Sequence, residues 1–168
     1  MLIDRLAADH GVQVRRDECR SLMGRFTLFG ETVELVKPQT YMNLSGEAVS
    51  CLVQKPDRDI SRLVIVSDDL ALPLGSIRIK PKGSHGGQNG LRSVIDRLKT
   101  SDFIRLRIGM SPDHPVSNTR DFVLQNFAKS EIETVEKVIS VGAEAVLAVI
   151  ADGVEQAMAR YNGPVEKG

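Results

Sequence analysis

The hydrophobic and polar positions of this chain predict helices and strands that alternate along the sequence. Apolar residues at helical spacing predict a helix over residues 2–7. Residues 19–28 and 31–36 have the composition of two strands joined by a tight turn at Gly30–Glu31. Pro38 then ends the second strand, because proline has no amide hydrogen to donate to a sheet. The first part of the chain is therefore expected to hold a helix followed by a β-hairpin.

A second group of apolar positions predicts the centre of the fold. Helical spacing recurs over residues 48–53, and residues 63–66 form a short apolar run that is typical of a strand covered on both faces. Asp68 and Asp69 follow this run, so we expect two acids just beyond the carboxyl end of a buried strand. Ligand sites of open α/β sheets lie at such ends, which makes the two acids functional candidates. Solvated strand-end acids are the alternative.

Two further strands are predicted by the alternation of apolar and basic positions. Residues 76–80 and 104–108 each place apolar side chains on one face and basic side chains on the other. Arg105 and Arg107 are therefore expected on an outward, basic edge of the second of these strands.

The remaining periodic segments predict helices. A helix is expected over residues 91–98, and a long helical tract begins at a Ser130–Glu133 capping box and breaks at Asp152–Gly153. Residues 111–121, with two prolines, are expected to form an exposed loop. Interleaved helices and strands predict an α/β fold with a mixed central sheet flanked by helices. The length of 168 residues suits one domain over residues 1–168.

The composition is that of a globular chain, with 42% hydrophobic and 26% charged residues. No apolar run approaches the ~20 residues that a membrane-spanning helix needs, and the start of the chain lacks a secretory-signal pattern. We therefore expect a cytoplasmic protein. Cys19 and Cys51 are too few for a disulfide framework, and we expect them as reduced, buried, small apolar side chains. The spacing of histidines, cysteines and acids indicates no metal site.

A glycine-rich loop over residues 83–90 joins a predicted strand to a predicted helix. Its four glycines let the backbone approach a ligand closely, and the N-terminus of the following helix favours anionic groups. The loop has neither the Gly-Lys pair of a P-loop nor the G-x-G-x-x-G spacing of dinucleotide-binding folds. A mobile connection with Asn89 as the helix N-cap is the alternative.

Asn43 and the three histidines are the other polar candidates. Asn43 is either a helix cap or an amide that holds a carbonyl group. His10 lies at a predicted helix end, where stabilisation of the helix dipole is its expected role, and His114 lies in the exposed loop. His85, in the glycine-rich loop, is the histidine placed to face a ligand. The spacing predicts no Ser-His-Asp or Cys-His arrangement.

The formal net charge of zero, from 22 basic and 22 acidic residues, conceals a strong segregation of charge. Residues 74–110 hold eight basic residues and two acids, so this segment carries +6 and the remainder carries −6. A basic face beside a glycine-rich loop suits a phosphate-bearing partner. A mixed, solvated surface is the alternative.

Two long motifs resemble signatures of the bacterial peptidyl-tRNA hydrolases. They are Lys37-Pro38-Gln39-Thr40-Tyr41-Met42-Asn43-Leu44-Ser45-Gly46 and Gly83-Ser84-His85-Gly86-Gly87-Gln88-Asn89-Gly90-Leu91-Arg92. Residues 67–70 and 103–109 match the family in order and spacing, and the similarity extends as far as Asn162.

The resemblance implies a monomeric α/β enzyme that hydrolyses the ester between a peptide and the 3′ ribose of tRNA, with no metal or organic cofactor. The released tRNA would return to translation. Asn43 would contact the substrate, and Tyr41 and Met42 would line the peptide channel. Asp68 would orient the catalytic histidine and favour its useful tautomer. Asn89 would position the substrate and the attacking water.

Other residues would hold the RNA and cover the cleft. The resemblance implies that Lys80 and Arg107 meet tRNA phosphates and that Gly86 belongs to the substrate-binding loop. Residues 111–121 correspond to the lid region. No membrane partner is expected.

The family also has a first strand with an Asn-Pro-Gly segment, then a Thr-Arg-His-Asn segment whose histidine is the general base. Neither segment occurs in residues 1–168. We therefore expect a chain that lacks the N-terminal strand and the catalytic histidine, with its activity as written strongly reduced, since general base catalysis contributes ~10²–10⁴-fold. The alternative function is a non-catalytic tRNA-binding relative. A small-molecule phosphate binder has support from the glycine-rich loop alone.

Overall fold

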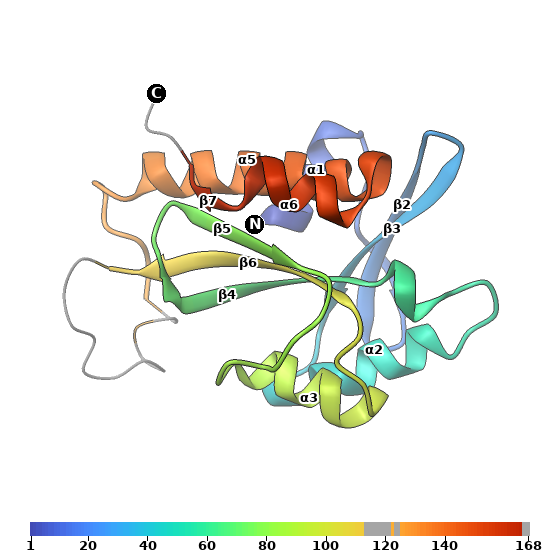
Figure 1. Ribbon diagram of the computed structural model, residues 1–168. Coiled ribbons are helices and arrows are strands. Elements are labelled where there is room, and N and C mark those ends of the chain that lie inside the picture. The colour runs from blue at the N-terminus through green and yellow to red at the C-terminus, as the bar shows by residue number, and fades with distance from the viewer. Residues whose placement is uncertain (113–121, 123–124, 166–168) are drawn as a thin grey trace. The chain divides into compact units, whose positions relative to one another are not determined.

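The computed structural model describes residues 1–112, 122 and 125–165 (Figure 1). The chain divides into two compact units. The first unit is made of Met1–Val64 and Pro81–Ile104, and the second unit of Ile65–Lys80 and Arg105–Gly168. Each unit is described by itself. No helix of the described residues is long and apolar enough to cross a membrane.

The first unit combines a three-stranded sheet with three α-helices. Its elements are α1 (Leu2–Asp9), β1 (Arg16–Glu18), β2 (Ser21–Leu28), β3 (Glu31–Pro38), η1 (Met42–Leu44), α2 (Ser45–Val53), η2 (Ile60–Arg62) and α3 (Asn89–Leu98). The strands follow one another in the order β1-β2-β3, and both neighbouring pairs are antiparallel. The predicted hairpin, the end of its second strand at Pro38 and the predicted helices are confirmed. The turn of the hairpin is Phe29–Gly30 and not Gly30–Glu31, because Leu28 pairs with Glu31. The short strand β1 was not predicted.

Close packing joins α1 and the segment after it to the hairpin. The ring of His10, the C-cap residue of α1, stacks on Phe26 of β2 with 4.0 Å between the ring centroids. A β-carbon on Gly24 would stand 2.6 Å from Cγ1 of Val12, so only glycine allows the two segments to approach this closely. Leu6 and Met23 are buried in the core of this unit.

In its described residues, the second unit is a sheet with two helices packed against β5. Its elements are β4 (Val64–Pro73), β5 (Ser76–Lys80), β6 (Ile104–Ser111), α5 (Ile132–Asp152), α6 (Val154–Tyr161) and β7 (Gly163–Pro164), with β4 and β6 each starting at the unit boundary. The strand order is β4-β6-β5-β7, and α5 and α6 contact β5 (Figure 1). The α/β class is confirmed, as is the predicted helix break, where Gly153 adopts a φ of +89°. The N-cap of α5 is Glu131, so the predicted capping box was wrong.

Two sequence expectations about the second unit are overturned by strand pairing. The strand after residue 63 does not end at Val66 but continues to Pro73, so Asp68 and Asp69 lie within β4. Pairing continues past the apolar run, as the hydrogen bond of 2.9 Å from the Leu74 amide to the Ser111 carbonyl shows. Arg105 is 1% exposed rather than outward, on β6, which is an inner strand between β4 and β5. Burial, and the neighbouring charge of Arg107, lower the pKa of Arg105.

The expectation of two reduced cysteines was also wrong. Cys19 and Cys51 form a disulfide, with their Cα atoms 5.8 Å apart. Cys19 lies in the turn between β1 and β2 and Cys51 lies in α2, so the bond crosses from sheet to helix. The two residues are 32 positions apart, and no local pattern in the sequence reports that the fold brings them together.

Candidate functional site

The first predicted group of site residues lies on the short helix η1 and just before it. The side chains of Tyr41 and Met42 are open to solvent, being 81% and 57% exposed. Asn43 is also exposed. The helix α2 has Leu44 as its N-cap and no side-chain hydrogen bond at that cap, so Asn43 does not cap it. The interpretation of Asn43 as the cap of this helix is therefore wrong.

The glycine-rich loop forms a tight, polar turn before α3. Gly83, Gly86 and Gly87 all have positive φ angles. The Gly87 amide donates to Nδ1 of His85 at 3.0 Å, so this histidine is used within its own loop. Gln88 is the N-cap of α3: its Oε1 accepts the Leu91 amide at 2.7 Å.

The alternative interpretation of the loop, a connection with Asn89 as the helix N-cap, was therefore wrong about the cap. Asn89 is the first residue of α3 and is exposed. Its side chain is not used as the cap of the helix, because Gln88 already fills that role.

The two motifs pack directly against each other. Nε2 of Gln88 approaches Sδ of Met42 at 3.7 Å, and that sulfur lies 2.6 Å from where a β-carbon on Gly90 would stand. Further along the two helices, the amide of Gly46 in α2 donates to Oγ of Ser93 in α3 at 3.0 Å. A β-carbon on Gly46 would meet the Ser93 carbonyl oxygen at 2.1 Å. Glycine at these two positions thus lets η1 and α2 lie against α3 (Figure 1).

The other predicted residues, Asp68, Lys80 and Arg107, belong to the second unit. Lys80 is exposed at the end of β5. Arg107 faces Arg78 across the β5–β6 ladder, where like charges repel. Nη2 of Arg107 forms an ion pair with Oδ2 of Asp69, and only 20% of the Arg107 side chain is exposed.

Asp69 is a residue whose role sequence reasoning missed. Its side chain is 8% exposed, and its Oδ1 accepts the amide of Ala71 at 2.8 Å. The carboxylate is thus fixed by its own strand and in turn holds Arg107. Neighbouring residues of a strand point to opposite faces of the sheet, so the sequence could have predicted that Asp68 and Asp69 have different surroundings.

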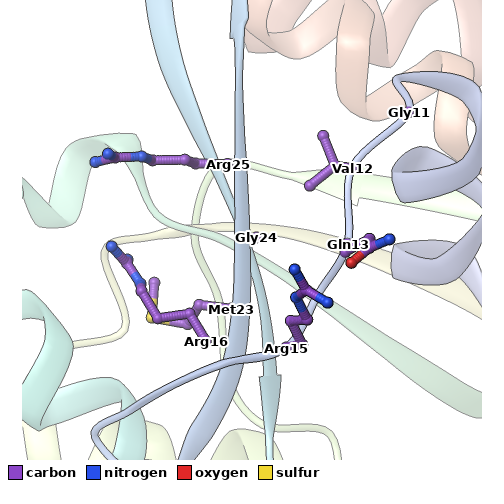
Figure 2. Close-up of a pocket in the computed structure, with 8 residues that line it drawn as sticks. All are labelled: Gly11, Val12, Gln13, Arg15, Arg16, Met23, Gly24 and Arg25. Atoms are coloured by element: carbon purple, nitrogen blue, oxygen red, sulfur yellow. The ribbon is translucent and has the colours of Figure 1, made fainter.

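A shallow groove of about 640 Å³ lies elsewhere in the first unit (Figure 2). It is lined by Gly11, Val12, Gln13, Arg15, Arg16, Met23, Gly24 and Arg25, none of them a predicted site residue. The guanidinium groups of Arg15 and Arg25 point in different directions in Figure 2. Arg16 is paired with Glu18 at 3.1 Å and Glu34 at 3.4 Å. Of the three arginines that line the groove, Arg16 is thus already paired with acids.

Among the described residues, no three His, Cys, Asp or Glu side chains come together as metal ligands. Residues 113–121, which include His114 and most of the expected lid, lie outside the described residues.

Comparison with known proteins agrees with the motif geometry. A family model described as peptidyl-tRNA hydrolase matches residues 1–168. The chain belongs to the peptidyl-tRNA hydrolase family. The peptidyl-tRNA hydrolase of Solibacter usitatus is 42% identical over 162 residues, covering 96% of this chain and 83% of the relative. That of Chlorobium phaeobacteroides is 43% identical over 165 residues, covering 98% and 87%.

Solved structures of the family share the fold. A crystal structure of a peptidyl-tRNA hydrolase in complex with N-propanol has a TM-score of 0.90 at 29% identity, covering 99% of this chain and 85% of that chain. The peptidyl-tRNA hydrolase from Acinetobacter baumannii has a TM-score of 0.88 at 31% identity, covering 98% and 84%. Both the sequence motifs and the backbone therefore place this chain among the peptidyl-tRNA hydrolases.

Proposed function

We propose that this chain acts on peptidyl-tRNA, hydrolysing the ester that joins the peptide to the 3′ ribose and releasing free tRNA for translation. Family membership supports this proposal. The observation that carries it is the packing of the two motifs, in which Met42 lies against Gly90 and Gly46 against Ser93. This packing presents the exposed amides of Asn43 and Asn89 from adjacent elements without using either as a helix cap.

The proposed roles follow from where each side chain lies. Tyr41 and Met42, exposed on and beside η1, supply apolar surface for the peptide. Asn43 holds the substrate carbonyl, and Asn89 positions the substrate and the attacking water. An amide suits both tasks, because it offers a donor and an acceptor and stays uncharged.

Gly86 and the basic residues have binding roles in this proposal. Gly86 keeps the loop free of a side chain where the substrate passes. Lys80 meets tRNA phosphates as an exposed point charge. Arg107 does so with a guanidinium that Asp69 holds in place.

Asp68 is proposed to orient the catalytic histidine and to favour the tautomer that accepts a proton from water. The proposal assigns that role of general base to the histidine of the family's Thr-Arg-His-Asn segment, which does not occur in residues 1–168. His10 stacks on Phe26, and His85 accepts a hydrogen bond from Gly87, so each has a local structural use. Reading the genomic sequence upstream of Met1 tests the assignment of the base.

The function is tested with an N-acyl-aminoacyl-tRNA, by measuring both ester cleavage and binding. Asn43→Ala and Asn89→Ala are expected to lower substrate binding relative to the parent chain. Asp68→Asn is expected to lower cleavage in a protein that also carries the Thr-Arg-His-Asn segment, because Asp68 is proposed to act through that histidine. Asn126→Ala and Asp17→Asn, which change exposed residues outside the proposed site, are the matched controls. Cleavage equal to the buffer blank together with salt-dependent tRNA binding would instead support the non-catalytic tRNA-binding relative. Absence of both cleavage and binding would refute the proposal.

The contribution of the basic residues is tested by salt dependence. Lys80→Gln is expected to weaken tRNA binding and to lower the slope of log K against log salt by about one, as loss of one phosphate contact does. Asp68→Asn should leave this slope unchanged, since Asp68 is proposed to act on the reaction and not on the phosphates. An unaltered slope for Lys80→Gln would remove Lys80 from the RNA-binding residues.

A further inference from the structure

The turn between β1 and β2 has an unusual backbone. Glu18 pairs with Ser21, so Cys19 and Arg20 are the two central residues of a tight hairpin turn. Both are left-handed, with φ angles of +51° and +55°. Asn and Gly are the usual residues of such turns, because a side chain with a branched or long stem fits this conformation poorly. A left-handed turn made of cysteine and arginine is therefore expected to need stabilising contacts from the rest of the structure.

Three interactions tie Cys19 and Arg20, at the centre of this turn, to residues before and after η1. The disulfide joins Cys19 to Cys51 of α2. Nη1 of Arg20 pairs with Oε2 of Glu47, also of α2. The carbonyl of Arg20 accepts the amide of Gln39 at 2.8 Å.

These three interactions bracket η1 on both sides along the chain. Gln39 precedes Tyr41 by two residues, whereas Glu47 and Cys51 follow η1 on α2. The other carboxylate oxygen of Glu47 accepts from Nη2 of Arg97 of α3 at 3.0 Å, so the turn is also tied to the helix that follows the glycine-rich loop. The position of the turn is therefore linked to both motifs.

Between these anchors, the segment touches α3 and the loop before it through Met42, which lies against Gln88 and Gly90. Tyr41 and Met42 are largely exposed. The hydrogen bonds within the segment are local: the Leu44 amide donates to the Tyr41 carbonyl at 2.9 Å, and Oγ of Ser45 donates to the Met42 carbonyl at 2.9 Å. The direction of Asn43 consequently depends on the contact of Met42 with the start of α3 and on where the two ends of the segment are fixed.

We propose that the Glu18–Ser21 turn is a redox-sensitive clamp that positions the Tyr41–Asn43 segment for substrate, with the Cys19–Cys51 disulfide as its covalent part. The identity of the substrate rests on the proposed function, whereas the mechanical link between turn and segment does not. Cys51 is an exposed residue of α2, so we expect a small thiol to reach it. Where a cell compartment is kept in a reducing state, the disulfides that proteins do form there are commonly transient and serve to sense the redox state.

The opening step is a thiol–disulfide exchange with a small dithiol. One thiolate of the reagent attacks Sγ of Cys51, the S–S bond breaks, and Cys19 leaves as a thiolate that takes up a proton. The second thiol of the reagent then attacks the mixed disulfide, which releases Cys51 as a thiol and closes the reagent's own disulfide. Two electrons pass from the reagent to the protein. The ion pair of Arg20 with Glu47 and the hydrogen bond from the Gln39 amide to the Arg20 carbonyl remain.

Amide hydrogen exchange tests the mechanical part of the proposal. Exchange over residues 39–46 is expected to be faster after reduction with dithiothreitol, while the long helix α5 exchanges unchanged. Cys19→Ser and Cys51→Ser should each behave like the reduced protein and should not respond to dithiothreitol. Arg20→Gln should loosen the reduced segment further, whereas Arg5→Gln, which removes an exposed Arg–Asp pair in α1, should not. Equal exchange in both redox states, or two titratable thiols in protein that has not been reduced, would overturn the clamp.

Substrate binding tests the positioning part. Reduced protein and Cys51→Ser are expected to bind N-acyl-aminoacyl-tRNA about three- to ten-fold more weakly than the oxidised protein, because an ordered site loses less freedom on binding. Where cleavage is measurable, KM should change more than kcat. Equal affinity in the two redox states of a protein that does bind tRNA overturns the clamp and leaves the proposed function standing. Failure of the oxidised protein to bind or cleave this substrate overturns the proposed function, and the exchange experiment still decides the clamp.

Discussion

The sulfur of Met42 occupies the space that a side chain on Gly90 would need. Met42 comes from the first family motif and Gly90 from the second, so their contact couples two segments that are far apart in the sequence. The side chain of Met42 is long, flexible and largely exposed, whereas the backbone of α3 beneath it is fixed. This difference allows the position of Met42 to be changed without unfolding the protein.

Gly90→Ala is expected to displace Met42 and to weaken binding of the peptide part of the substrate. The free energy of unfolding should change by less than about 1 kcal/mol, because the higher helix propensity of alanine offsets the shift of Met42 and the smaller shift of the Gln88 side chain, whose Oε1 would lie 3.0 Å from the new β-carbon. Binding of N-acyl-aminoacyl-tRNA and urea unfolding measure the two effects. Full substrate affinity in the variant would show that the place of Met42 over Gly90 is unimportant for binding.

Gly46→Ala is the contrasting case, because the atoms in the way are backbone atoms. The new β-carbon would lie 2.1 Å from the Ser93 carbonyl oxygen and 2.5 Å from the Ser93 carbonyl carbon. The helices α2 and α3 must then separate, and we expect a loss of about 1–3 kcal/mol in the free energy of unfolding. Urea unfolding of this variant beside Gly90→Ala measures the difference. Equal stability of the two variants would contradict the close crossing of α2 and α3.

Asp69→Leu is expected to destabilise the second unit by roughly 3 kcal/mol, because it leaves the mostly buried side chain of Arg107 without its carboxylate partner. The loss should be largely recovered in Asp69→Leu/Arg107→Met, where both charges are gone. A double-mutant cycle with Arg107→Met, followed by urea unfolding, isolates the coupling between the two side chains. A coupling energy near zero would show that Asp69 and Arg107 act independently.

Acid is expected to destabilise the first unit through Glu18 and Glu34. Hydrogen bonds from Lys55 and Arg58 lower the pKa of Glu18 from 4.5 to about 2. Arg58 likewise lowers the pKa of Glu34. A pKa that is lower in the folded state means that the stabilisation is present above 4.5 and is lost as the pH falls toward 2.

Arg58→Met should therefore flatten the fall in the free energy of unfolding over this pH range, since both carboxylates lose a donor. Arg5→Met, which removes the exposed Arg5–Asp9 pair, is the control and should keep the parent's acid profile. Urea unfolding at several pH values between 4.5 and 2 measures both variants. Identical profiles for Arg58→Met and the parent chain would contradict this account.

Local patterns were sufficient for most of the elements and for the motifs of the site. The β2–β3 hairpin follows from β-forming residues around a two-residue turn, and the break between α5 and α6 follows from Gly153. The motif residues, from Tyr41 to Asn43 and from Gly83 to Gly90, identify the family before any geometry is considered. Such features depend on residues that are near one another in the chain, so the sequence displays them directly.

The tertiary structure alone decided which distant side chains meet. The Cys19–Cys51 disulfide, the burial of Arg105 on an inner strand and the pairing of Asp69 with Arg107 all depend on strand order, register and helix placement. A basic residue in an alternating strand has the same sequence pattern whether the strand lies at an edge or inside a sheet. The sequence by itself therefore determined the elements, the motifs and the family. The contacts that hold the turn against α2, and Arg107 against β4, were decided by the fold, because they join residues that no local period relates.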